Sequence, residues 1–148
     1  MFKGKHLHSV DKKGRVSIPA KLRKDISPDA HNTFIMTPSL DGNQCFDLHP
    51  KNLWTQIEER LRGLNKFVEE EARFLRMISQ YSDETEMDGQ YRIVIPQPLI
   101  SWAKIDDEAL LLGVLDKIEV WNPKIYETYI ENYSESFGAM AEKLMQDR

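Results

Sequence analysis

The chain has 148 residues, enough for one globular domain or for two small half-domains that share a core. Its single cysteine excludes an internal disulfide framework, and it shows neither a secretion signal nor the ~18 consecutive apolar residues of a membrane-spanning helix. The formal net charge is -4, yet residues 1–25 contain eight Lys or Arg and only two Asp. We therefore expect a reduced, cytoplasmic protein whose N-terminal end either attracts a polyanion or is an ordinary solvated surface.

The first predicted element is a hairpin whose turn lies at residues 11–14, with the sequence Asp-Lys-Lys-Gly. Asp11 and Gly14 occupy the first and fourth positions that these residue types favour in a type I turn, and Gly14 can adopt the left-handed conformation of a three-residue loop. On the outgoing strand, Arg15 and Ser17 point to one side, and the aliphatic residues that alternate with them point to the other. The turn thus separates a basic face from an apolar face.

Short elements follow this hairpin. Pro19 is placed like the first residue of a helix, and residues 20–25 give barely two helical turns. Strands are predicted over residues 33–38 and 45–48, around an Asp-Gly turn. In the second half of the chain, residues 109–115 and 118–121 repeat this strand pattern, around Asp-Lys.

Apolar residues at helical spacing predict three helical stretches. They are Leu53, Trp54, Ile57 and Leu61 in the first stretch, Phe67, Phe74, Leu75 and Ile78 in the second, and Ile125, Tyr129, Ile130 and Tyr133 in the third. Such stripes are typical of helix faces buried in a core. Contacts between subunits are the alternative, because small half-domains cannot easily cover this many apolar faces internally.

The chain repeats itself. Residues 11–19, Asp-Lys-Lys-Gly-Arg-Val-Ser-Ile-Pro, align with residues 88–96, Asp-Gly-Gln-Tyr-Arg-Ile-Val-Ile-Pro. Residues 46–51 align in a similar way with residues 119–124, and each of these segments opens a helix-like stretch. We therefore expect two copies of one unit, in which a strand-turn-strand is followed by a short helix, a hairpin and a longer helix.

This repeat predicts the organisation of the chain. The first half-unit spans residues 1–62 and the second spans residues 85–134, with a helical connection over residues 63–84. A tail over residues 135–148 is either helical or frayed.

These motifs resemble the MraZ family of bacterial transcriptional regulators. The resemblance rests on the opening Met-Phe-Lys-Gly, the paired Asp-x-x-x-Arg motifs that end in Ile-Pro, and the Met-Asp-Gly-Gln-Tyr-Arg of residues 87–92, and it covers nearly the whole chain. It implies an α+β fold: a tandem AbrB-like swapped-hairpin β-barrel, pseudo-dimeric within one chain, with flanking helices. It also implies control of the division and cell wall gene cluster and assembly into closed rings.

The basic N-terminal segment fits a DNA-binding role. Lys and Arg near a duplex release condensed counterions, and Arg15, on a strand that can enter the major groove, can make a bidentate contact to guanine. The expected DNA contacts are Lys3, Lys5, Lys13, Arg15 and Arg92, and the residues expected to shape the turns are Asp11, Gly14, Asp88 and Gly89.

We therefore predict a sequence-specific double-stranded DNA-binding repressor that is nucleoid-associated. It is expected to act as a ring-shaped homo-oligomer on direct repeats upstream of its own gene, spaced by about one helical turn. The alternative is a ring-forming structural or protein-interaction module whose basic turn binds acidic partners.

The second copy departs from the family pattern. Tyr91 stands where the first copy has Gly14, and Gly89 has moved next to Asp88, so the second loop can close by a different turn. Arg92 has acidic neighbours and no other cation until Lys104. We therefore expect the first copy to dominate phosphate binding.

Other chemistry is not expected. His6 and His8 share a strand face but have no third metal ligand nearby in sequence, and Cys45 is typical of a small buried hydrophobic residue. No carboxylate pair or Gly-rich phosphate loop is evident. The sequence therefore predicts no enzyme activity, no cofactor, no metal site and no small-molecule ligand.

Overall fold

The structure is a computed structural model that describes residues 1–146. Its strands are β1 (Phe2–Ser9), β2 (Arg15–Ser17), β3 (Thr33–Pro38), β4 (Phe46–Pro50), β5 (Asp83–Glu86), β6 (Arg92–Val94), β7 (Glu108–Leu115) and β8 (Lys117–Trp121). Its helices are α1 (Ala20–Arg23), α2 (Lys51–Arg62), α3 (Glu69–Tyr81), α4 (Gln97–Trp102), α5 (Pro123–Glu131) and α6 (Phe137–Leu144), with a 3-10 turn η1 (Pro28–Ala30). The fold is mixed α+β, as predicted.

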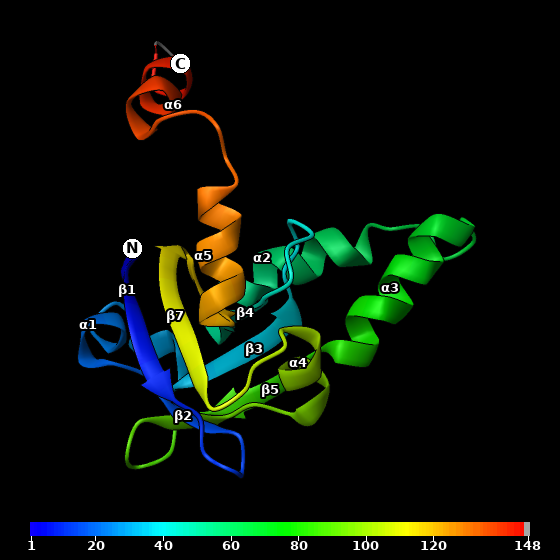
Figure 1. Cartoon of the computed structure of the whole chain (residues 1–148). Coiled ribbons are helices and arrows are strands. Elements are labelled where there is room, and N and C mark those ends of the chain that lie inside the picture. Colours follow the sequence, from blue (N-terminus) through cyan, green and yellow to red (C-terminus); the bar gives the residue numbers. More distant parts are fainter. Residues whose placement is uncertain (147–148) are drawn as a thin grey trace.

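Strands from both halves of the sequence are interleaved in one antiparallel sheet. The strand order is β1-β7-β8-β4-β3-β5. In it, β1 pairs with β7 and β4 pairs with β8, so strands of the first half form hydrogen bonds with strands of the second half. A separate two-stranded ribbon pairs β2 with β6, again one strand from each half. This arrangement places the two aligned Asp-to-Pro motifs side by side (Figure 1).

The strand pairing of residues 1–146 does not close into a barrel, which differs from the expectation for the fold. β1 and β5 remain the edges of the six-stranded sheet. The reason is that β2 and β6 form their backbone hydrogen bonds with each other. They therefore do not join the two edge strands of the six-stranded sheet. Beside the β1–β2 turn, the backbone is joined by the bond from the Asp11 N–H to the Arg15 carbonyl, 3.1 Å long.

The two halves of the sequence share a single main core. Equivalent residues of the aligned motifs are buried together, each at most 2% exposed: Val16 and Ile93, Ile18 and Ile95, Leu22 and Leu99. Leu22 anchors α1 and Leu99 anchors α4 to this core. Because apolar burial is the main favourable term in folding, each half depends on the other for its stability.

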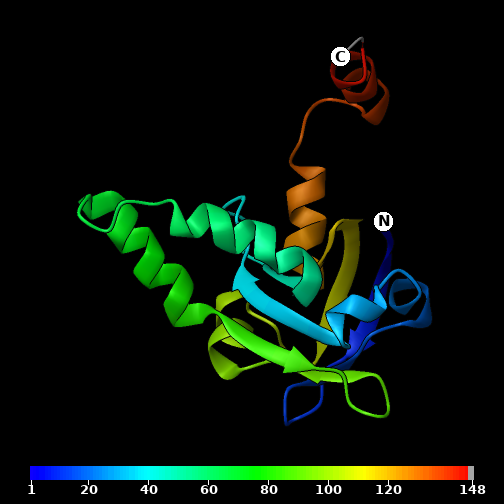
Figure 2. The ribbon, with the colours of Figure 1, turned by 180° about the vertical axis from the view of Figure 1, so that it is seen from behind.

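The longer helices extend away from this core. α2 and α3 form an arm on one side of the sheet, whereas α5 and α6 extend in another direction (Figures 1 and 2). No residue of α2, α5 or α6 is fully buried, although Ile125 and Tyr126 of α5 pack partly buried against the small core cluster of Cys45, Leu110 and Trp121. The prediction that Phe67 belongs to the stripe of α3 is wrong, because Phe67 precedes that helix and is 99% exposed.

The tail over residues 135–148 is helical where α6 lies, and its last two residues lie outside the described part of the chain. Among residues 1–146, no helix combines the length and the apolar character that crossing a bilayer requires.

Candidate nucleic-acid interface

The first turn is organised by the carboxylate of Asp11. Its Oδ1 accepts hydrogen bonds from the N–H groups of Lys13 and Arg15, both 2.9 Å long. Its Oδ2 accepts a hydrogen bond from Arg15 Nε at 2.7 Å. The Gly14 N–H donates to the Asp11 carbonyl at 3.0 Å. Asp11 therefore closes the turn and also orients the arginine that follows it.

Gly14 is required by this turn for two reasons. Its φ is +78°, in the left-handed region that favours glycine. A Cβ placed on it would lie 2.6 Å from the carbonyl oxygen of Ile95, on the neighbouring strand end. Asp11 and Gly14 thus lie at the first and fourth positions of this turn, and the backbone at Gly14 leaves no room for a side chain.

The second turn closes in the same way as the first. Asp88 Oδ1 accepts from the N–H groups of Gln90 and Arg92 at 2.8 and 3.0 Å, and Asp88 Oδ2 accepts from Arg92 Nε at 2.9 Å. The Tyr91 N–H donates to the Asp88 carbonyl at 2.9 Å. The expectation of a different second turn is wrong, because the aspartate carboxylate, present in both copies, organises the loop.

Tyr91 takes the left-handed conformation that Gly14 has in the first copy, with a φ of +63°. This conformation is costly for a residue with a side chain. The guanidinium of Arg23 lies over the ring of Tyr91, which gives the strained residue a compensating contact. Gly89 has no positive φ, so a glycine is not required there by the backbone.

Both pairs hold the carboxylate in its charged form. The backbone N–H of Arg15 is the main cause that lowers the pKa of Asp11, and the backbone N–H of Arg92 does the same for the pKa of Asp88. Hydrogen bonds to a carboxylate favour the ionised state. Each arginine therefore faces a permanent anion at neutral pH.

The β2–β6 ribbon brings the two arginines onto one face. Ser17 is paired with Arg92, two residues along β2 from Arg15, and the central pair, Val16 with Ile93, points into the core. Because side chains alternate along a strand, Arg15, Ser17 and Arg92 all point outward. Diagonal neighbours of this kind are about 7 to 8 Å apart, so both guanidinium groups can serve a single surface.

Within the part of the chain that the structure describes, each arginine leaves the terminal end of its guanidinium group free of hydrogen bonds. The ion pair to aspartate uses Nε, and among residues 1–146 the terminal Nη atoms of Arg15 and Arg92 donate no hydrogen bond. The side chains of Arg15 and Arg92 are 32% and 30% exposed, so both remain in contact with solvent. A guanidinium held this way can donate two parallel hydrogen bonds to one acceptor edge.

The structure separates the predicted lysines into two groups. Lys13 lies in the first turn, beside the equally exposed Lys12. Lys3 and Lys5 lie on β1, and Lys3 is about 20 Å from Ser9 at the strand's far end, given a rise of about 3.3 Å per residue. In Figure 1 the N-terminus lies at one end of β1, and the two turns lie beyond the other end of that strand. Lys3 and Lys5 are thus not brought together with the ribbon.

The two turns differ in charge, as predicted. The first carries Lys12 and Lys13, whereas the strand leading into the second carries the exposed acids Glu84 and Glu86. Glu84 forms an ion pair with Lys51 at 3.4 Å. The surface around Arg15 is therefore more basic than the surface around Arg92.

Sequence reasoning missed Arg23 as a part of this site. Its guanidinium contacts Tyr91 of the other half-unit, and its Nη1 donates to the Ile18 carbonyl at 3.1 Å. No spacing pattern could have indicated it, because the contact depends on the pairing of β2 with β6.

Away from the two turns, the buried side chains of Cys45, Asp47 and Glu119 bring their ligand-type atoms within 4.8 Å of one another. Buried Asp47 and Glu119 both contact Lys117 Nζ, at 3.1 and 3.2 Å, so an ammonium group balances their charge. Cys45 is fully buried beside them, and burial raises the pKa of its thiol. Within residues 1–146, His6 and His8 join no cluster of three ligand-type side chains.

Sequence comparison shows which known proteins this chain resembles. A model of the family described as "MraZ protein, putative antitoxin-like" matches residues 1–77 and 80–148. A relative from Desulfitobacterium hafniense (strain DSM 10664 / DCB-2), named Transcriptional regulator MraZ, is 35% identical over 146 residues, which cover 98% of this chain and 97% of the relative.

Relatives from Moorella thermoacetica and Pelotomaculum thermopropionicum have the same name. They are 34% and 36% identical to this chain. The aligned residues cover 98% of this chain and 97% and 96% of the two relatives. These names are those of regulators and not of enzymes, which agrees with the prediction of a non-enzymatic protein.

Proposed function

The chain belongs to the MraZ family, and we propose that it is a sequence-specific regulator of transcription that binds double-stranded DNA through the β2–β6 ribbon. The observation that carries this proposal is the position of Arg15 and Arg92 on one outward face, each oriented by an aspartate. The major groove of B-DNA, about 12 Å wide, admits a two-stranded β-ribbon.

In this proposal the arginines read bases. Their free Nη atoms match the O6 and N7 acceptors of guanine, the commonest specific contact of an arginine in the major groove. Asp11 and Asp88 hold the guanidinium planes in advance, so less side-chain freedom is lost when DNA binds. Gly14 acts through the shape and the space of the first turn, whereas a side chain at Gly89 would meet nothing within 4 Å.

The lysines have a different role in the proposal. Lys12 and Lys13 contact phosphates next to the base-reading face and supply affinity that does not depend on sequence. Lys3 and Lys5, farther along β1, are peripheral phosphate contacts. The first copy contributes more of the salt-dependent affinity than the second, because Lys12 and Lys13 lie in its turn and the second turn, residues 88–91, has no lysine.

The repeat also supports a proposal about the fold. The half-units of residues 1–62 and 85–134 form an interlocked pseudo-dimer of the AbrB-like swapped-hairpin type, joined by residues 63–84. Support comes from the pairs β1–β7, β4–β8 and β2–β6, which all join one half to the other. The ribbon then caps the open side of the six-stranded sheet.

A single chain presents only two base-reading arginines, so useful affinity requires several copies held at a fixed spacing. We infer a ring-shaped homo-oligomer that binds direct repeats upstream of its own gene and represses the division and cell wall gene cluster. The protein would then act in the cytoplasm, associated with the nucleoid.

An electrophoretic mobility-shift assay tests this function, because bound protein retards the DNA in the gel; this retardation is called retention below. The probe is the DNA upstream of the protein's own gene, and a shuffled duplex of equal length is the competitor. Arg73→Ala is a matched control, because Arg73 also pairs with an acid four residues away, Glu69 at 3.2 Å, but on α3. We expect Arg15→Ala to lose specific retention and Arg73→Ala to keep it. Equal retention of both duplexes by the parent chain would favour a module that binds acidic partners.

A further inference from the structure

The C-terminal helix α6 has an apolar face that the described chain leaves partly exposed. Phe137, Met140, Ala141 and Leu144 have the spacing of one helical face. Phe137 is 85% exposed and Leu144 is 49% exposed. Figures 1 and 2 show α6 away from the body, at the end of an extended connection. A helix of eight residues is far below the roughly 12 to 15 at which isolated helices become even marginally stable, so α6 needs a partner surface.

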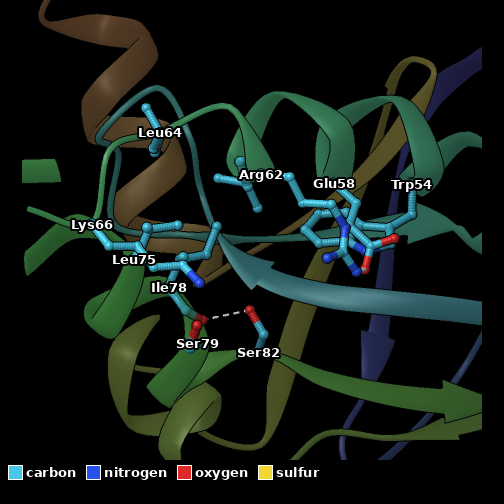
Figure 3. A pocket seen from close by; sticks show the side chains of 10 residues that line it. Trp54, Glu58, Arg62, Leu64, Lys66, Leu75, Ile78, Ser79 and Ser82 are labelled. Atoms are coloured by element: carbon cyan, nitrogen blue, oxygen red, sulfur yellow. Dashed lines mark hydrogen bonds and ion pairs between the residues drawn. The ribbon is translucent and has the colours of Figure 1, made fainter. Parts of the chain in front are cut away.

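A groove between α2 and α3 has the chemistry of such a partner. Its volume is about 380 Å³, and Figure 3 shows side chains from both helices and from the connecting loop around it. Its apolar lining consists of Trp54, Leu61, Leu64, Leu75 and Ile78. Two antiparallel helices that leave an apolar groove open are a common receptor for the apolar face of a third helix.

Charges around the groove and on the C-terminal segment are complementary. Lys66 lines the groove, and Arg76 lies in an adjoining hollow of the same arm. Glu131 ends α5, and Glu142 lies on α6. Within residues 1–146 none of these four residues takes part in an ion pair, so two cations on the arm and two acids on the C-terminal segment are available to each other.

We propose that α6 of one copy of this chain docks its apolar face in the α2–α3 groove of a neighbouring copy. This inference rests on the assembly of several copies proposed above, and it names the surfaces that join them. The five residues between α5 and α6 span at most about 17 Å, so they allow the helix to be donated across a short gap.

The neighbour, and not the same chain, is the occupant that fits the arrangement. α5 directs α6 away from the arm formed by α2 and α3, and the two project from the body in different directions (Figure 1). The donating and accepting surfaces are different parts of the molecule. Such a head-to-tail contact repeats from copy to copy, and it generates either a closed ring or an open filament.

Cross-linking between two variants tests this interface in the full-length protein. Leu75→Cys places a thiol in the groove, and Met140→Cys places one on the apolar face of α6. The native Cys45 is fully buried, so the parent chain is the blank for the thiol reagent. With a short bismaleimide, we expect covalent dimers when the two variants are mixed, and none from either variant alone.

The same reagent distinguishes the occupants of the groove. A chain with both substitutions should give a ladder of cross-linked oligomers. A cross-linked monomer would show that α6 folds back into its own groove and would overturn the proposal. The absence of products in the mixture and in the double variant would overturn it as well. Replacing Met140→Cys by Gly138→Cys, which lies off the apolar stripe, should sharply reduce the yield.

Oligomeric mass measured by light scattering gives a second readout. Phe137→Asp should convert the oligomer to single chains, whereas Gly138→Asp should leave it intact, because nothing lies within 4 Å of a Cβ at that position. Arg76→Glu should weaken the assembly, and adding Glu142→Arg should restore it. An unchanged mass for Phe137→Asp would overturn the proposal.

This interface can fail or hold independently of DNA binding. If cross-links form but the parent chain does not retain its upstream DNA, the α6 contact stands and the regulatory function does not. If DNA is retained and no cross-links form, the function stands and copies meet through other surfaces. A small apolar molecule that binds in the groove should displace α6 and lower the mass of the assembly. If the molecule binds there and the mass does not change, α6 does not dock in the groove.

Discussion

Arg23 and Tyr91 form a contact between the two half-units, with the guanidinium carbon of Arg23 3.7 Å from the centroid of the Tyr91 ring. Tyr91 has a left-handed backbone, and Arg23 extends from the end of α1 in the other half. The contact therefore couples the second turn to the shared core.

We expect Arg23→Ala to lower the free energy of unfolding by about 1 kcal/mol, the size of a partly exposed cation–π contact. It should also weaken DNA binding, because the turn that orients Arg92 becomes less ordered. Urea denaturation and electrophoretic retention measure the two effects. Lys24→Ala, one residue farther along, is a control for loss of charge; if it weakens binding as much as Arg23→Ala, the contact with Tyr91 is not the cause.

Arg15→Ala should abolish specific retention while the protein remains folded. The loss of one bidentate base contact costs about 1 to 3 kcal/mol at each site, and more when several copies bind together. Arg92→Ala should have the smaller effect, because its surroundings are acidic. Binding constants at a fixed salt concentration test this order, with Arg73→Ala as the control. Equal losses for the two ribbon arginines would refute the asymmetry.

Asp11→Ala separates two physical effects that predict opposite results. Removing an anion near DNA favours binding through simple electrostatics. Removing the acceptor of three hydrogen bonds releases the turn and Arg15, which disfavours binding. We expect the second effect to win, so that Asp11→Ala weakens specific retention with little change in its salt dependence. Tighter specific binding by this variant would show that the aspartate does not act by positioning the arginine.

The buried pair Asp47 and His49 should give opposite dependences of stability on pH. Burial raises the pKa of Asp47 to about 6 despite Lys117, and burial lowers the pKa of His49 to about 4. The folded Asp47 holds a proton that the unfolded chain releases, so its contribution to stability is lost as the pH rises through 6. The folded His49 excludes a proton that the unfolded chain binds, so its contribution is lost as the pH falls from 6.5 to 4.

Single substitutions should reveal these slopes. In Asp47→Asn only the histidine remains, and urea midpoints should fall between pH 6.5 and pH 4 more steeply than in the parent. In His49→Gln only the aspartate remains, and the midpoints should rise over the same decrease in pH, relative to the parent. Parallel curves for the parent and both variants would contradict this assignment.

The spacing of DNA sites should follow one helical turn. A head-to-tail assembly presents its ribbons in the same orientation, so direct repeats about 10 base pairs apart keep successive major grooves on the side that faces the protein. Footprinting on promoter variants measures this: inserting five base pairs between two repeats should strongly weaken protection, and inserting ten should largely preserve it. A palindromic footprint would be incompatible with this geometry.

The duplicated motifs and the first turn followed from the sequence alone. Asp11 and Gly14 are three positions apart in the sequence, and the Gly14 N–H donates a hydrogen bond to the Asp11 carbonyl. A turn of this kind depends only on residues that are neighbours in the chain. The family could be recognised for the same reason, since its signature lies within short continuous segments. Sequence reasoning was wrong about the second turn, because it gave weight to the displaced Gly89 and overlooked that Asp88 makes the same hydrogen bonds as Asp11.

Only the tertiary structure decided which residues share a surface. Arg15 and Arg92 lie far apart in sequence, and they face the same way because burial of Val16 against Ile93 sets the register of β2 on β6. A shift of one residue in that register would have turned one arginine toward the core. The extended course of β1 likewise separates Lys3 from the turn, although both belong to the same basic segment of the sequence. Local spacing determines turns and helices, whereas long-range burial determines the face on which the charged groups meet.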